Sequence, residues 1–268
     1  MDTTEPALVV GIFWTLFVGT HIGLTTRRIR TTLVERLRER GFLAVFSLTA
    51  SVLFACAVRY YAAHRMEGAP GLALGGVPLV REILIAAVVL GIVLMAAGSV
   101  AYPGSPYDLL AHAVRPVRGI ERVTRHPFFA GVALLALAHA LLATRLVGTV
   151  VFASVAVLAI AGSAHQDRKL LARLGRPYAD YLRVTSAVPF AAIIGGRQRL
   201  MPGELSITAL AAGLVIAVVL RKVHAGIFAL GGTWVIVAVV GGAGVFAWLS
   251  TRQAQRAAVL PAPAPSRS

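Results

Sequence analysis

Seven histidines are the main chemical resource of an otherwise apolar chain: His21, His64, His112, His126, His139, His165 and His224. Of its 268 residues, 57% are hydrophobic and only 14% are charged, and the mean hydropathy is +0.78. A neutral imidazole can ligate a metal or move a proton, and an imidazole inside a bilayer needs a partner. Facing histidines in a helical bundle can form a haem site. Histidines within apolar segments are therefore the first functional candidates.

Three of these histidines lie in or at the end of an apolar run. His139 is the only strongly polar side chain between Pro127 and Ala143. It is either a ligand or proton relay, or a side chain that bonds a polar group of a neighbouring helix. His21 follows an apolar run and precedes an arginine-rich segment, and His64 ends another run. For these two, an ordinary polar residue at the membrane interface is the alternative.

A second polar group surrounds the start of the run that contains His139. Pro127 suits the first turn of a helix, because that turn leaves its N–H groups unbonded anyway. Arg125 and His126 then lie just outside this helix, and Asp167 follows the next apolar run. The link between the two runs is so short that their helices must be antiparallel neighbours. We therefore expect Arg125 and Asp167 to form a charge-assisted pair at one end of the hairpin.

The apolar runs predict an all-α fold, a polytopic transmembrane helical bundle with about seven spans, each near the ~20 residues that cross a bilayer. The predicted spans are 7–25, 42–63, 81–101, 127–144, 147–165, 204–221 and 226–249. After the fifth span, a basic amphipathic segment ends at Gly175, and a turn with Tyr178 and Tyr181 follows. Such a segment is typical of a helix that lies at the headgroups.

The basic residues set an orientation for these spans. With seven spans, 20 of the 26 lysine and arginine residues fall on one side, in segments 26–40, 102–126 and 166–203 and in the C-terminal tail. The positive-inside rule then predicts an outer N-terminus and an inner C-terminus in a bacterial inner (plasma) membrane. We expect one integral membrane domain, 1–251. The proline-rich tail, 252–268, should be disordered and cytoplasmic.

The net charge of +15 suits loops against an anionic leaflet better than a nucleic acid, because no groove-reading or base-stacking motif is visible. The expected surroundings are therefore membrane lipid, with a lipophilic small molecule as the substrate of any enzymatic activity. The sequence has no Walker loop, no GxSxG and no HExxH. The single cysteine, Cys56, excludes an internal disulfide and a cysteine-based zinc cluster.

Five motifs follow one another along roughly residues 8–228. They are Thr20-His21-Ile22-Gly23-Leu24 with the arginines after it and Glu39-Arg40-Gly41; Tyr60-Tyr61-Ala62-Ala63-His64-Arg65; Arg125-His126-Pro127 leading to Ala138-His139; His165-Gln166-Asp167-Arg168; and the run 183–197. In this order and spacing the chain resembles the NnrU family and, within it, the plant-type 15-cis-ζ-carotene isomerases. The run 183–197 is the most specific of the five.

The resemblance implies a cofactor and a substrate class. It implies haem b, bound by two of the three histidines His21, His64 and His139, and it implies a polyene as the substrate. For bacterial members it implies a link to denitrification. The chain departs from the isomerase pattern at one position, because those relatives carry a cysteine where it has Ala136.

A wider resemblance leads to the alternative function. The isoprenylcysteine carboxyl methyltransferases share residues that correspond to Arg125, His126, Pro127, Asp167, Gly175, Tyr178 and Tyr181. This resemblance implies methyl transfer that depends on S-adenosylmethionine, at a cytoplasmic-face site. Those enzymes usually have paired glutamates where this chain has Gln166 and Asp167. A third hypothesis is a non-enzymatic assembly or maturation factor for a respiratory complex.

Depth in the bilayer favours one pair of the three histidines. At 1.5 Å per residue, His139 lies ~18 Å from the inner end of its span, whereas His21 lies only ~6 Å from the inner end of its own. His64 is closer to His139 in depth. The spacing therefore slightly favours His64 with His139 as the haem ligands.

Overall fold

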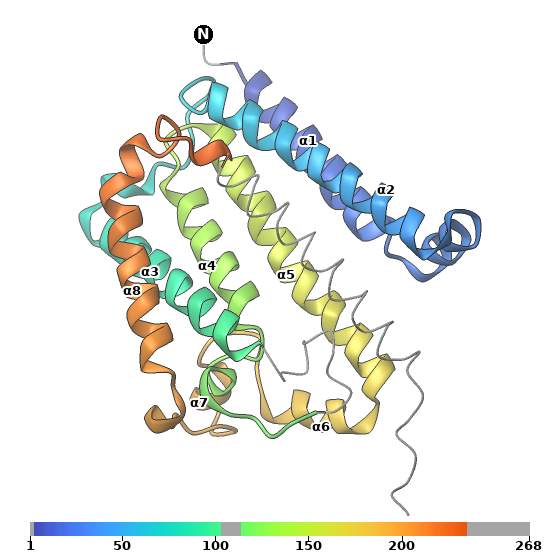
Figure 1. The fold of residues 1–268 in the computed structure, drawn as a ribbon. Coiled ribbons are helices and arrows are strands. Elements are labelled where there is room, and N and C mark those ends of the chain that lie inside the picture. Colours follow the sequence, from blue (N-terminus) through green and yellow to red (C-terminus); the bar gives the residue numbers. More distant parts are fainter. Residues whose placement is uncertain (1–2, 103–113, 235–268) are drawn as a thin grey trace, which may run out of the picture.

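The computed structural model describes residues 3–102 and 114–234, and every regular element within these ranges is a helix (Figure 1). The α-helices are α1 (Glu5–Gly23), α2 (Arg27–His64), α3 (Pro78–Ala101), α4 (Pro127–Leu142), α5 (Leu146–Leu174), α6 (Arg176–Val184), α7 (Ala191–Ile194) and α8 (Ile207–Val223). Short 3-10 turns are η1 (Leu74–Gly76), η2 (Gly119–Arg122), η3 (Pro202–Glu204) and η4 (His224–Gly226). The all-α class expected from the sequence is confirmed for these residues.

Five of the helices, α1, α2, α3, α5 and α8, are long and apolar enough to cross a membrane. α4 is apolar too, but its 16 residues rise only ~24 Å. The predicted span 226–249 lies mostly outside the described residues, and the predicted tail 252–268 lies wholly outside them. The count of seven spans and the orientation of the termini therefore stay predictions.

Most predicted span ends lie within three residues of the observed helix ends, but two differ. The arginine-rich segment before the second predicted span is itself helical, so α2 begins at Arg27 and turns sharply at Arg38, whose φ of 58° lies in the left-handed region. α5 continues past its predicted end at 165 to Leu174, where Gly175 caps it with a φ of 60°. The predicted amphipathic segment is thus the extension of a spanning helix.

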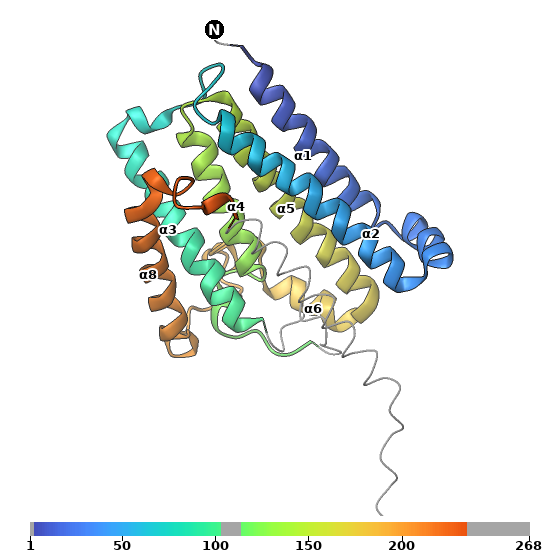
Figure 2. The same ribbon diagram turned by 45° about the horizontal axis from the view of Figure 1, so that its top comes forward.

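α5 lies in the middle of the bundle. α1 and α2 pack on one side of it, and α4, α3 and α8 follow on the other side (Figures 1 and 2). α1 and α5 begin at the same end of the bundle and run in the same direction (Figure 1), because Gly11 in the second turn of α1 lies against Val150 in the second turn of α5. Rings fill the contact between α1 and α2: Trp14 and Phe17 meet Phe54, with centroids 6.0 and 5.6 Å apart.

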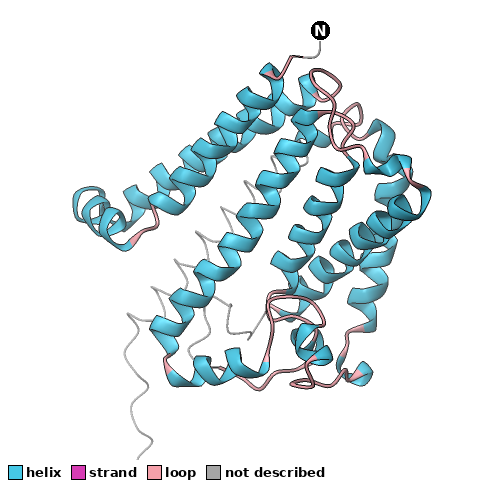
Figure 3. Cartoon of the chain, turned by 180° about the vertical axis from the view of Figure 1, so that it is seen from behind, coloured by secondary structure: helices cyan, strands magenta, loops and turns pink. Residues whose placement is uncertain are grey.

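The two ends of the bundle differ in construction (Figure 3). The hairpin end consists of the connections 65–77 and 143–145. Backbone hydrogen bonds join them, from Gly71 N–H to the Thr144 carbonyl and from Leu146 N–H to the Ala69 carbonyl. The opposite end, named the cap end, consists of 114–126 and 175–206.

Glycines bring α3 and α4 into close contact. A Cβ added at Gly91 would lie 2.6 Å from the Gly131 carbonyl oxygen, which is too close for any real side chain. Small residues at a helix interface permit such backbone approach inside a membrane. This contact fixes α4 on α3 and so positions both ends of α4, where the candidate site residues lie.

Candidate functional site

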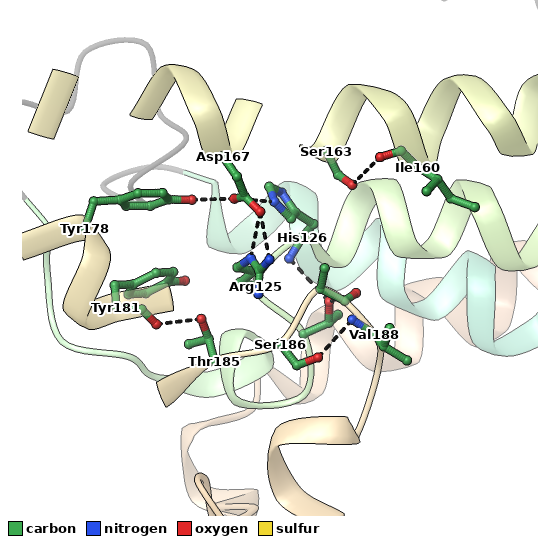
Figure 4. A network of polar contacts seen from close by, with 12 residues as sticks. Arg125, His126, Ile160, Ser163, Asp167, Tyr178, Tyr181, Thr185, Ser186 and Val188 are labelled. Atoms are coloured by element: carbon green, nitrogen blue, oxygen red, sulfur yellow. Dashed lines mark hydrogen bonds and ion pairs between the residues drawn. The ribbon is translucent and has the colours of Figure 1, made fainter. Parts of the chain in front are cut away.

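The densest polar network of the described residues lies at the cap end, around Asp167 of α5 (Figure 4). Arg125 donates to Asp167 Oδ2 from Nε at 3.0 Å and from Nη2 at 2.8 Å. The other carboxylate oxygen, Oδ1, lies 2.8 Å from the His126 Nε2 atom and accepts a hydrogen bond of 2.6 Å from the Tyr178 hydroxyl. The predicted contact between Arg125 and Asp167 is therefore confirmed, and two further side chains complete it.

The run 183–197 forms the wall behind this network. The Arg125 N–H donates to the Ser186 carbonyl at 2.8 Å, and the Thr124 hydroxyl donates to the Ala187 carbonyl at 2.8 Å. The Arg197 guanidinium donates to the carbonyls of Arg183 and Thr185, which closes the run on itself. The most specific sequence motif thus binds the backbone that presents Arg125 and His126.

A second set of charges lies beside the first. Arg122 holds Glu204 through two hydrogen bonds, from Nε at 2.8 Å and from Nη2 at 2.9 Å, and the Gly119 N–H adds a third at 2.7 Å. These donors lower the pKa of Glu204 to about 2, the Arg122 bonds contributing most. Arg115 pairs with Glu121 at 3.0 Å.

Glu121 is the most buried carboxylate of the cap end, with 1% of its surface exposed. Burial raises the pKa of Glu121 to about 7, against the opposing charge of Arg115. Its Oε2 atom is buried and has no hydrogen-bond partner. No sequence pattern indicated this residue, because a single glutamate between arginines is typical of a solvated loop.

His139 lies at the hairpin end, one turn from the end of α4, and this helix begins at Pro127 as predicted. Its Nδ1 atom lies 2.8 Å from the Leu135 carbonyl oxygen. Its ring packs on Phe152 of α5, with centroids 4.8 Å apart, and faces the ring of His224 at 5.9 Å.

Aromatic and cationic groups of α2 extend this hairpin-end cluster. Tyr61 lies 5.9 Å from Phe152 and 6.0 Å from Phe228, measured between ring centroids. The Arg65 guanidinium lies over the ring of Phe228 at 5.0 Å. The cluster therefore joins α2, α4, α5 and the segment after α8.

The other two predicted haem ligands lie elsewhere. The Nδ1 atom of His64 lies 2.9 Å from the Tyr60 carbonyl, and its ring stacks on Tyr60 at 4.1 Å. His21 ends α1 on the side away from the hairpin end, against Phe17 and Phe46, and its buried Nδ1 atom has no partner. Among the described residues, no observed contact joins any two of these three histidines.

Sequence reasoning missed the neighbour of His139. The structure brings His224 to it, although the sequence placed His224 only in a short turn. Helical spacing shows which residues share one helix face, but it does not show which distant helix meets that face. The two tyrosines were expected as interfacial anchors, whereas Tyr178 is fully buried and Tyr181 nearly so.

The fold and the cap-end network together define an all-helical protein with several helices of membrane-spanning length. The NnrU protein family matches residues 8–231, so the chain belongs to this family. It is 30% identical over 234 residues to the 15-cis-zeta-carotene isomerase, chloroplastic, of Arabidopsis thaliana, which covers 80% of this chain and 60% of that protein. The enzyme of the same name from Zea mays is 30% identical over 194 residues, or 69% of this chain and 50% of that protein.

The chain thus spans about half to three fifths of the length of the curated relatives it matches. No solved structure matches it. Both curated relatives are isomerases, and the methyltransferase alternative gains no support from the comparisons.

Proposed function

We propose that this chain is a haem b-binding membrane protein of the isomerase type, acting on a lipophilic polyene in a bacterial inner membrane. The relatives named as isomerases support the reaction class. The observation that supports haem binding is the position of the proton on the imidazole of His139. A carbonyl oxygen only accepts hydrogen bonds, so the contact with Leu135 requires the proton on Nδ1. The Nε2 lone pair is then available to a metal.

The donor chemistry of the chain fits this cofactor at two of the three predicted positions. His64 repeats the arrangement of His139, because its Nδ1 also faces the carbonyl four residues earlier. Both residues lie at the hairpin end, whereas His21 lies toward the other end. The buried, unpartnered Nδ1 of His21 instead marks a polar atom that a water or ligand would satisfy.

Haem b, when bound, would supply an iron centre able to exchange electrons with a conjugated substrate. The residues of the chain would hold the cofactor and the substrate. The bond to the Leu135 carbonyl would orient the His139 imidazole, and Phe152 would hold the plane of this ring by packing against it. The rings of Tyr61 and Phe228 would give a lipophilic substrate an apolar surface.

The test is a visible spectrum of detergent-purified protein from haem-replete cells, followed by incubation with a 15-cis polyene. We expect a Soret band that shifts on reduction, together with a change in the cis–trans composition of the polyene. A colourless protein would overturn the haem proposal. A colourless protein that co-purifies with respiratory subunits would instead support the assembly-factor hypothesis and the link to denitrification.

A further inference from the structure

A cleft of about 200 Å³ opens at the cap end, between the last turn of α3 and the start of α8. Val100, Ala101 and Leu210 contribute apolar surface to it. Arg115 and Arg118 contribute positive charge. Among the described residues, no histidine and neither member of the pair Arg125 and Asp167 lines it, so the cleft is separate from both clusters described above.

The charges of the cleft do not balance. Glu204, which also lines it, is neutralised by the two hydrogen bonds from Arg122. Arg115 already donates to Glu121. Arg118 is exposed, and within the described part of the chain it forms no ion pair, so its charge acts on Glu121 and Glu204 only from beyond ion-pair distance. One positive charge at the mouth of the cleft is therefore left for a ligand.

The apolar wall continues onto surface that faces outward. Val100 is 59% exposed, and on the adjoining helix Ile207 is 80% and Leu214 is 52% exposed. Both α3 and α8 are long and apolar enough to cross a membrane, so these side chains would face acyl chains. The start of α8, where the Ser206 side chain accepts from the Ala209 N–H, adds the positive end of a helix dipole.

We propose that the cleft binds one anionic phospholipid. Its phosphate would lie at Arg118 and Arg115, and one acyl chain would run along Val100 and the exposed side of α8. A zwitterionic phospholipid carries its own ammonium group, which offsets the attraction to Arg118. Free phosphate would supply the charge without the apolar contact. The site depends on neither haem nor isomerase activity.

The experiment uses the full chain, delipidated in a neutral detergent and mixed with either phosphatidylglycerol or phosphatidylcholine. Native mass spectrometry counts the lipids that each protein retains. We expect preferential retention of phosphatidylglycerol, and we expect Arg118→Gln to reduce its affinity about fivefold, the effect of one basic residue at an anionic surface. Arg118→Lys should retain most of the affinity. Val100→Trp should also weaken retention of phosphatidylglycerol, because the larger indole would fill the space along the apolar wall of the cleft.

Arg176→Gln is the matched control, because Arg176 is exposed at the same end and does not line the cleft. Its retention of phosphatidylglycerol should equal that of the unchanged protein. An equal loss of affinity for phosphatidylglycerol in Arg118→Gln and Arg176→Gln would overturn the proposed site. Equal retention of the two lipids by the unchanged protein would overturn it too. Displacement of the lipid by millimolar inorganic phosphate would also overturn it, in favour of a simple phosphate site.

Discussion

Arg125 and Asp167 are 42 residues apart in the sequence, yet two guanidinium nitrogens of Arg125 meet one carboxylate oxygen of Asp167. Because His126 and Tyr178 approach the other oxygen, a single carboxylate ties α5 to α6 and to the segment that leads into α4. Asp167 is therefore the residue on which the geometry of the cap end depends most.

Replacing Asp167 should destabilise the protein strongly. Asp167→Ala leaves Arg125 without its partner in a site where the two side chains are only 16% and 13% exposed. We expect a loss of about 3 kcal/mol in the free energy of unfolding, measured by denaturation in detergent. The control is Asp180→Ala, which removes the exposed pair with Arg183 and should cost less than ~1 kcal/mol. Equal losses would mean that the network does not brace the cap end.

His139→Ala should remove or shift the Soret band of the purified protein. Membrane insertion should be unaffected, because alanine suits an apolar helix better than histidine does. His126→Ala is the comparison: it should lower thermal stability through Asp167 but keep the spectrum. Colour lost with His126 and kept with His139 would place the haem at the cap end and would be incompatible with the hairpin-end assignment.

Glu121 should make stability depend on pH. Its folded-state pKa of about 7 lies above its usual value of 4.5, so the folded chain holds a proton that the unfolded chain releases. This contribution to stability is full below pH 4.5 and is lost as the pH rises through about 7. Glu121→Gln cannot titrate. Between pH 4.5 and 8, the free energy of unfolding of the unchanged protein should fall by at most ~3 kcal/mol relative to that of this variant. If the two proteins showed the same dependence of unfolding free energy on pH, the raised pKa of Glu121 would be refuted.

Gly91→Ala should weaken the contact between α3 and α4. The new methyl group would lie 2.6 Å from the Gly131 carbonyl, so the helices must separate. We expect a destabilisation of about 2 kcal/mol, seen as a lower melting temperature in detergent. Gly19→Ala is the control, since no atom lies within 4 Å of the added Cβ there. A melting temperature that is unchanged in both variants would contradict the close packing.

The orientation of the bundle can be tested at its two ends. A reporter inserted after Gly71 lies at the hairpin end, and one fused after Leu174 lies at the cap end. The positive-inside rule predicts a periplasmic signal from the first and a cytoplasmic signal from the second. The reverse pattern would invert the orientation, and the same signal from both would show that the two ends do not lie on opposite sides.

Local patterns in the sequence were enough to predict the helices and one contact. The apolar runs located both ends of four helices, α1, α3, α4 and α8, within three residues, and one end each of α2 and α5. The short link between α4 and α5 was enough to predict that Arg125 and Asp167 are neighbours. That inference worked because an antiparallel hairpin fixes which helix ends meet. It needed no knowledge of the rest of the fold.

Contacts between elements that are distant in the chain could not be predicted from the sequence. His224 follows α8, and its approach to His139 depends on how α8 packs on α3 and on the turn after it. The burial of Glu121 similarly depends on η2 folding against residues far along the chain, such as Glu204. Helical periodicity carries no information on either of these arrangements.

The short helix α4 has a consequence for the surrounding lipid. At ~24 Å it is ~6 Å shorter than a typical hydrocarbon core, whereas α3 and α5 have 24 and 29 residues. Phe128, at one end of α4, is 49% exposed, so part of this short helix reaches the outside of the bundle. Hydrophobic mismatch on this side favours local thinning of the bilayer. The protein should therefore partition into the thinner regions of a membrane that contains lipids of unequal chain length.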